Sequence, residues 1–147
     1  MACRLIVLYC PFSDRTPKIA MANWTPEGIT GHIFRLSDRY LPVSAGIPSP
    51  VLWGDEGVVR RRLGTHGVHV QTVRRAFIYE LPFPPREVVH IFREYFGPMK
   101  TAFTRLDPTS QTAYAEELER LWSEHNEDEN GKTITQNDYL EVIGTRL

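Results

Sequence analysis

Hydrophobic and polar positions alternate along the chain with two different periods, which predicts both strands and helices. A short apolar run at residues 19–22 is bounded by polar and turn-forming residues, as expected for a buried strand. Apolar residues then recur at helical spacing over residues 29–40. Residues 67–81 alternate with the period of a strand and change phase near Thr72, which predicts a bulge or bend there.

The remaining segments complete an alternating order of strands and helices. We expect a helix that Asp55 caps and that ends near Leu63, a helix that starts in the proline-rich segment 82–85 and ends at Gly97, a short helical stretch over 99–106, a helix opened by residues 107–110, and a last strand over 133–143. This order predicts an α/β fold.

The junction of the first strand and the first helix is the strongest candidate for a site. Asn23 and Trp24 leave the strand, Thr25 offers its hydroxyl as an N-cap, and Pro26 and Glu27 suit the first turn of a helix. In open α/β sheets, ligands bind at the carboxyl ends of strands. The three residues from Asn23 to Thr25 are therefore candidate binding residues.

Composition limits the classes of protein to consider. The chain has 147 residues, 41% hydrophobic and 24% charged, which fits one globular domain. Its net charge of −1 gives no reason to expect a nucleic-acid or anionic-membrane partner, and no segment is long and apolar enough for a membrane span. Cys3 and Cys10 fit neither a zinc motif nor a disulfide scaffold, so we expect a reducing, cytoplasmic location.

No motif of a known catalytic centre can be recognised, and the catalytic residues stay unknown. The chain has no nucleophile elbow, phosphate loop or dinucleotide fingerprint, and its glycines are scattered. His66 and His69 have no third metal ligand at a suitable spacing. Residues 126–137 superficially look like a calcium loop, but Asn126 and Asn137 stand at its first and twelfth positions, where acidic ligands are needed. No metal site is expected.

Several segments, taken in order, match a known family. They are Ile19-Ala-Met-Ala-Asn-Trp-Thr-Pro-Glu-Gly28, Pro48-Ser-Pro-Val-Leu-Trp-Gly-Asp55, Phe77-Ile-Tyr79 with Phe83-Pro-Pro85, and Tyr139-Leu-Glu-Val142. In this combination they resemble the C-terminal half of class I S-adenosylmethionine-dependent methyltransferases, in the group similar to the ubiquinone and menaquinone-biosynthesis enzymes. The resemblance covers about residues 19–146.

The resemblance implies a partial Rossmann-like methyltransferase sheet, made of its last three strands and packed with helices. Residues 19–22 would be the fifth strand, residues 19–147 a methyltransferase-like half-domain, and residues 1–18 an atypical N-terminal segment that could add a strand. In that family the cofactor is held upstream of the matched region, so no residue here is assigned to S-adenosylmethionine. The family activity is methyl transfer to a small organic substrate, and we expect this truncated chain not to perform it alone.

The same resemblance leaves a hydrophobic substrate pocket in the retained half. Its predicted residues are Asn23, Trp24, Thr25, Phe34, Trp53 and Tyr79. Two alternative functions use this pocket without methyl transfer. One is a non-catalytic subunit that binds a small molecule or a partner, and the other is a cofactor-independent isomerase or cyclase.

A sheet that keeps only its last three strands has an exposed apolar edge at residues 19–22. Such an edge pairs readily with another strand. Either the apolar segment Arg4–Tyr9 supplies that strand, or the protein forms a homodimer through the edge.

Overall fold

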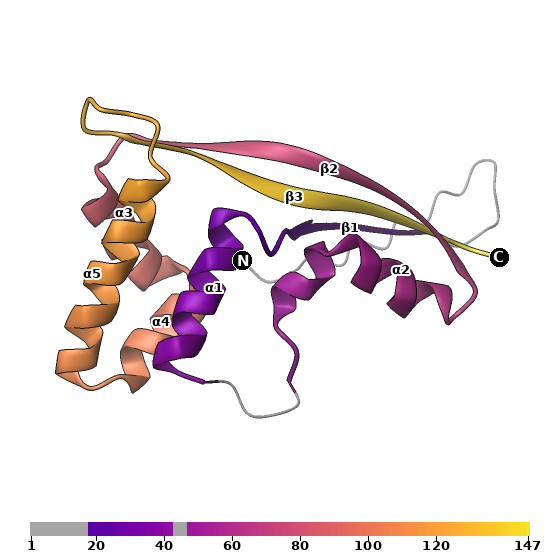
Figure 1. Cartoon of the computed structure of the whole chain (residues 1–147), viewed down its shortest axis with the longest axis horizontal. Coiled ribbons are helices and arrows are strands. Elements are labelled where there is room, and N and C mark those ends of the chain that lie inside the picture. Colours follow the sequence, from indigo (N-terminus) through magenta and orange to yellow (C-terminus); the bar gives the residue numbers. More distant parts are fainter. Residues whose placement is uncertain (1–17, 43–46) are drawn as a thin grey trace.

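The computed structural model describes residues 18–42 and 47–147 and has an α/β fold (Figure 1). Its elements are β1 (Lys18–Trp24), α1 (Ile29–Tyr40), the 3-10 helix η1 (Pro50–Gly54), α2 (Glu56–Gly64), β2 (Val68–Leu81), α3 (Pro85–Tyr95), α4 (Gly97–Arg105), α5 (Pro108–Glu124) and β3 (Thr133–Arg146). The predicted order of elements is confirmed. The possible added strand at Arg4–Tyr9 lies outside the described residues.

The three strands form one sheet in the order β1-β3-β2, and β3 is antiparallel to both of its neighbours. β1 and β2 therefore run in the same direction. The pairing of β2 with β3 continues in one register from Val68 opposite Arg146 to Leu81 opposite Thr133. The bulge predicted near Thr72 is thus wrong, and Figure 1 shows a long, curved strand pair instead.

The phase change in β2 arises because helices cover opposite faces of the sheet at its two ends. Near one end, Val70 and its β3 neighbours pack against α2 and η1, on what we call the α2 face. At the other end, Tyr79 and Leu81 pack against α1, α3 and α5, on what we call the bundle face. Residues of opposite parity point to opposite faces of a strand, so the buried parity switches along β2 without any bulge.

Two hydrophobic clusters stabilise these two ends. The larger one is formed by the helices, and its buried members are Ile29, Ile33, Leu36, Val88, Val89, Met99, Ala102, Phe103, Tyr114, Leu118 and Trp122. The smaller one lies between α2 and the sheet, and its buried members are Met21, Val59, Val70, Leu140 and Val142. Within the described ranges, no helix is long and apolar enough to cross a membrane.

The start of α1 differs from the prediction. The helix begins at Ile29, so Thr25 is not its N-cap, although the Thr25 hydroxyl accepts a hydrogen bond from Gly28 N at 3.2 Å. The capping oxygen comes instead from Asn137 of β3, whose Oδ1 accepts a bond from Thr30 N at 3.4 Å. Asn137 Nδ2 also donates to Thr30 Oγ1 at 2.7 Å. A fully buried side chain from the last strand thus orients the first helix.

Local caps begin the two helices that follow acidic residues. Asp55 is the predicted N-cap of α2, and its carboxylate accepts a bond from Val58 N at 2.8 Å, which confirms that prediction. Asp107 accepts bonds from Thr109 N and Ser110 N at the start of α5. Each cap satisfies backbone donors that have no partner within the helix.

The connection from α5 to β3 is held by its own side chains. Asn126 Oδ1 accepts bonds from Asp128 N and Ile134 N, at 3.1 and 2.8 Å. Asp128 Oδ2 accepts bonds from the backbone N–H groups of Lys132 and Asn130, and these bonds hold the pKa of Asp128 below its ordinary value. The side chains that suggest a calcium loop in the sequence therefore act as turn-forming groups in the structure.

Helix α1 packs against α5 through polar as well as apolar contacts. Glu117 accepts hydrogen bonds from Tyr40 Oη and Arg39 Nη2, both at 2.6 Å. The rings of His32 and His125 are 5.1 Å apart, and a His32 ring nitrogen lies 3.1 Å from the Glu27 carbonyl oxygen. Burial lowers the pKa of His32, and the nearby Arg35 and His125 lower it further.

Replacing Asn137 is expected to destabilise the fold strongly. Asn137→Leu leaves both Thr30 N–H and the Thr30 hydroxyl buried without this partner, at a cost of about 2–4 kcal/mol in the free energy of unfolding. Urea unfolding followed by circular dichroism measures the loss. Gln136→Ala, at the neighbouring exposed position, is the control and should stay within about 0.5 kcal/mol of the wild type. Adding Thr30→Val to Asn137→Leu should recover part of the loss, and purely additive effects would contradict the proposed pair.

Acidification should destabilise the protein through His32. Because its folded-state pKa lies below the ordinary value of 6.5, the unfolded chain binds this proton more readily. Its stabilising contribution is therefore complete above about pH 6.5 and is lost as the pH falls below that value and through the lower folded-state pKa. His32→Gln should lose less stability than the wild type between about pH 7.5 and about pH 5.5. Parallel losses in the two proteins, measured by urea unfolding at each pH, would count against this role.

Candidate functional site

The carboxyl end of β1 is fixed by close backbone contacts. Thr25 N donates a hydrogen bond to Asp138 O at 3.0 Å, which ties the residue after β1 to β3. Gly54, at the end of η1, lies so close that any Cβ there would collide with the carbonyl group of Trp24. The two segments around residues 23–28 and 48–55, distant in the sequence, therefore meet at this point.

Four aromatic side chains gather on the bundle face beside this junction. The Trp24 ring centroid lies 5.9 Å from Phe77, 5.9 Å from Tyr79 and 6.1 Å from Tyr139. Phe77 is 45% exposed, and the other three rings are half-buried. We call Trp24, Phe77, Tyr79 and Tyr139 the aromatic surface. Exposed rings at such spacing can pack against a flat apolar group of a ligand.

Buried polar groups lie at one side of the aromatic surface. Burial raises the pKa of Tyr79, and hydrogen bonds with Asn137 and Thr30 act in the opposite direction. The phenol therefore remains neutral at physiological pH. The amide and hydroxyl groups that hold the start of α1 also hold Tyr79, so the aromatic surface is coupled to the position of that helix.

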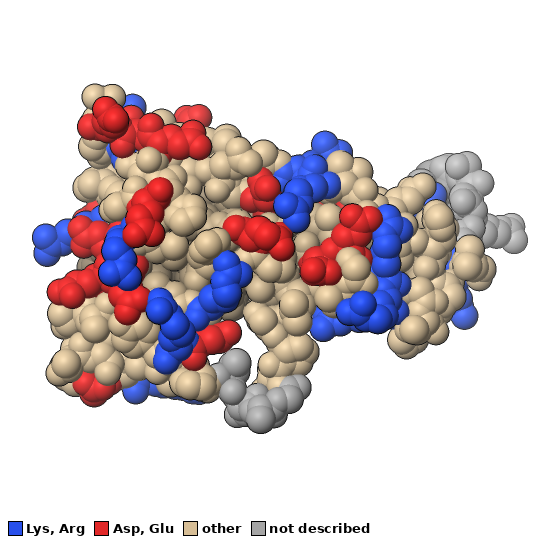
Figure 2. All heavy atoms as spheres, in the orientation of Figure 1, with Lys and Arg blue, Asp and Glu red and all other residues tan. Residues whose placement is uncertain are grey.

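Ion pairs lie at the protein surface on both faces of the sheet here, that of Arg74 on the α2 face and that of Arg75 on the bundle face. Arg74 Nη2 lies 2.9 Å from Glu27 Oε2, and Arg75 Nε lies 2.7 Å from Glu141 Oε2. The hydrogen bond from Arg75 holds the pKa of Glu141 below its ordinary value. Figure 2 shows acidic and basic side chains interspersed over most of the face in view, with basic ones gathered over α2. Arginine on α2 is itself engaged, since Arg60 bonds to Glu56 and to the Val70 carbonyl group.

The structure brings together only part of the predicted pocket. Trp24 and Tyr79 are in contact on the bundle face, with Thr25 buried at the adjacent turn. Asn23 has the opposite parity in β1 and is buried on the α2 face, in register with Leu140. Its side chain therefore points away from the aromatic surface.

The other two predicted residues lie elsewhere. The Phe34 ring on α1 contacts Phe96, with centroids 6.2 Å apart. Trp53 packs with the cluster on the α2 face, and the Arg62 guanidinium lies 4.7 Å from its ring centroid. The sheet separates Trp53 from Trp24, so the six predicted residues do not line one pocket.

Sequence reasoning missed Phe77, Tyr139 and Asn137 as members of the site. Phe77 and Tyr139 were visible as apolar strand positions, but their meeting with Trp24 depends on β3 lying between β1 and β2. Trp24 pairs with Tyr139, which pairs with Arg75. Only the register of the paired strands would have predicted that Phe77 and Tyr139 lie beside Trp24, and the register follows only once the strand order is known.

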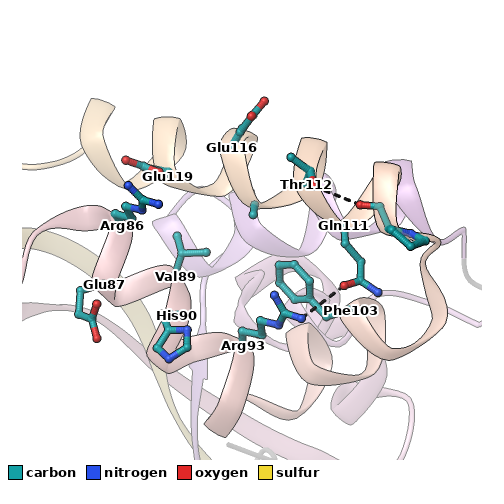
Figure 3. Close-up of a pocket in the computed structure, with 12 residues that line it drawn as sticks. Arg86, Glu87, Val89, His90, Arg93, Phe103, Gln111, Thr112, Glu116 and Glu119 are labelled. Atoms are coloured by element: carbon teal, nitrogen blue, oxygen red, sulfur yellow. Dashed lines mark hydrogen bonds between the residues drawn. The ribbon is translucent and has the colours of Figure 1, made fainter.

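A second feature is a groove of about 880 Å³ between α3 and α5, with Phe103 of α4 at its base (Figure 3). The Arg93 guanidinium lies 4.6 Å from the Phe103 ring centroid, and its Nη2 donates to Gln111 Oε1 at 3.3 Å. Basic residues of α3 and acidic residues of α5 face each other across this groove. None of the six predicted site residues lines it.

Metal binding finds no support in the described residues. Over 18–42 and 47–147, no three His, Cys, Asp or Glu side chains lie close enough to hold an ion together. The two histidines in contact, His32 and His125, are instead engaged with carbonyl groups of Glu27 and Leu121.

Comparison with known proteins finds relatives in mycobacteria. Uncharacterized protein Rv1403c of Mycobacterium tuberculosis and uncharacterized protein Mb1438c of Mycobacterium bovis are each 32% identical to this chain over 90 residues, which is 60% of this chain and 33% of theirs. Uncharacterized protein Rv1405c of Mycobacterium tuberculosis is 32% identical over 104 residues, 69% of this chain and 37% of its own length. The chain thus spans about a third of the length of these relatives. No model of a known protein family matches it.

Substituting Gly54 tests the close contact at the carboxyl end of β1. Gly54→Ala introduces a Cβ that collides with backbone atoms, which cannot move aside as a flexible side chain can. We expect a loss of about 1–3 kcal/mol in the free energy of unfolding, the usual cost of overpacking. Gly64→Ala, at the end of α2, meets no atom within 4 Å and should be neutral or slightly stabilising. Equal effects of the two substitutions in urea unfolding would contradict the contact.

Proposed function

We propose that this chain is the substrate-side part of an S-adenosylmethionine-dependent methyltransferase-like protein, and that it does not bind the cofactor by itself. The observation that carries this proposal is the meeting of residues 23–28 and 48–55 at the carboxyl end of β1, beside the aromatic surface. These are the two segments on which the family resemblance rests most heavily. A junction at the carboxyl end of a strand is also where α/β sheets bind ligands.

The sheet itself supports a partial Rossmann-like arrangement. With β1 as the fifth strand of the family, β2 and β3 become the sixth and seventh, and the last strand lies reversed between the other two. Within the described residues, the outer edge of β1 has no neighbouring strand, so a larger sheet would continue from there. The relatives, about three times as long as the matched region, have the additional chain that such a sheet needs.

The aromatic surface sets the class of substrate. Three rings converge on Trp24, Phe77 is the most exposed, and Arg75, which pairs with Tyr139 on the same face, is engaged in an ion pair with Glu141. Such a surface favours a small organic molecule with a flat apolar portion, and it offers little to an anionic polymer. We place the protein in the cytoplasm because its two cysteines give no sign of a disulfide framework.

All four rings of the aromatic surface belong to this chain, which favours the alternative of a non-catalytic binding subunit. A non-catalytic subunit could bind a small molecule on the same surface without any cofactor. The two functions differ in their need for a cofactor. Only the methyltransferase-like protein needs a cofactor-binding part, and this part would lie outside the segments that carry the family resemblance. A cofactor-independent isomerase or cyclase would need an acid and a base at this surface, and the four rings of the aromatic surface include two phenols, Tyr79 and Tyr139, and no carboxylate or imidazole.

Calorimetric titration with S-adenosylmethionine tests the cofactor part of the proposal. We expect no saturable heat up to about 1 mM, which means a Kd weaker than about 1 mM for this chain. Saturable micromolar binding would overturn it.

The substrate part is tested separately with 1-naphthol as a flat aromatic probe. The three tryptophan indole N–H signals can be followed in an amide NMR spectrum and assigned by single Trp→Phe variants. We expect the probe to shift the signal of Trp24, while those of Trp53 and Trp122 stay in place, because these two lie on the α2 face and in the helical core. A shift of Trp53 without Trp24 would contradict the assignment of the aromatic surface.

A further inference from the structure

The groove between α3 and α5 has a positively charged group at one end that no acidic side chain neutralises. Arg93 lies in the last turn of α3, and none of the ion pairs formed by the described residues includes it. Of the acidic side chains that line the groove, Glu87 and Glu119 lie with Arg86 at the opposite end, and Glu116 points away from α3 (Figure 3). The groove is therefore electrically asymmetric, with an unneutralised cation at the Arg93 end.

The Arg93 guanidinium is nevertheless held in a fixed position. It lies 4.6 Å from the Phe103 ring centroid, and its Nη2 donates to Gln111 Oε1 at 3.3 Å. Gln111 Nε2 in turn donates to the Leu106 carbonyl oxygen at 2.9 Å, so the amide oxygen of Gln111 faces Arg93. This arrangement uses one N–H group of the guanidinium, which has several more. An edge of the guanidinium remains for a carboxylate, which it can bind through two parallel hydrogen bonds.

The middle of the groove is apolar. Val89 lies one helical turn before Arg93, about 6 Å along α3, and it points toward α5 (Figure 3). Ala115 lies one turn after Gln111 on α5, is half-buried, and also lines the groove. Its small side chain leaves space beside Val89. A short apolar chain attached to a carboxylate at Arg93 would lie against these two side chains.

We propose that this groove binds a small monocarboxylate with an apolar tail. Arg93 holds the carboxylate, and the tail lies over Val89 and Ala115. The groove volume of about 880 Å³ is within the range of small-molecule sites. No residue of the aromatic surface lines the groove, so this inference does not rest on the proposed function.

The charges of the groove disfavour larger anions. Its lining includes two arginines, Arg86 and Arg93, but three glutamates, Glu87, Glu116 and Glu119. A phosphate dianion or a polyanion would meet one unneutralised guanidinium together with the repulsion of these carboxylates. A monocarboxylate needs only the one guanidinium, and its tail keeps charge away from the glutamates.

NMR titration of the full chain with hexanoate tests the proposal, and hexanamide is the neutral probe with the same tail. We expect hexanoate to shift the side-chain amide signals of Gln111 saturably, with a Kd of about 1 mM, the affinity of a very small ligand. Hexanamide should bind about tenfold more weakly, because it lacks the charge. No saturable shift up to about 20 mM hexanoate, or equal affinity for both probes, would overturn the proposal. Shifts confined to the Trp24 indole signal would also overturn it, because they would place the probe on the aromatic surface.

Inorganic phosphate at the same ionic strength tests the selectivity for a carboxylate with a tail. It should leave the Gln111 signals in place. Binding of phosphate as tight as that of hexanoate would mean that the groove takes any small anion, and the proposed ligand class would be wrong.

Single variants test the two parts of the site. Arg93→Gln should weaken hexanoate binding about tenfold or more and leave hexanamide binding unchanged. Arg105→Gln is the matched control, because Arg105 is an exposed arginine at the end of α4 that does not line the groove. Ala115→Leu fills the middle of the groove and should abolish binding of both probes. Unchanged hexanoate affinity in Arg93→Gln, or an equal loss in Arg105→Gln, would overturn the site, and circular dichroism establishes that all three variants are folded.

Discussion

The close approach of Gly54 to the backbone of Trp24 is the contact on which the site depends. It joins η1 to the carboxyl end of β1 and leaves no room for a side chain at position 54. The contact turns two separate segments into one junction and positions the first residue of the aromatic surface. A glycine is needed here for space and not for a left-handed backbone, since its φ is not positive.

β3 links this junction to the rest of the molecule. Its central position in the sheet allows Leu140 and Val142 to pack under α2, while Asn137 reaches the start of α1 on the other face. The same strand therefore contributes to the smaller hydrophobic cluster on one face and to the cap of the first helix on the other. A defect in β3 would disturb both ends of the sheet together, whereas a defect in α2 would first affect only one.

Local sequence patterns determined which elements form and in what order. Residues 19–22 and 29–40 are a strand and a helix because their apolar positions follow the two periods, and Asp55 begins α2 because its carboxylate bonds to a backbone N–H three residues later. These outcomes depend on interactions within a few residues, which a sequence displays directly. The N-cap assigned to Thr25 failed because Asn137, more than a hundred residues away, supplies the capping oxygen instead.

Only the tertiary structure decided which side chains share a surface. Trp24 and Trp53 both look like pocket residues in the sequence, yet the sheet separates them, whereas Phe77 and Tyr139 join Trp24 across β3. The phase change in β2 has the same origin, since helices cover opposite faces at its two ends. Strand order and the placement of helices over a sheet arise from long-range packing, and no local period encodes them. The sequence therefore predicts the junction at residues 23–25, whereas the tertiary structure determines which side chains lie beside it.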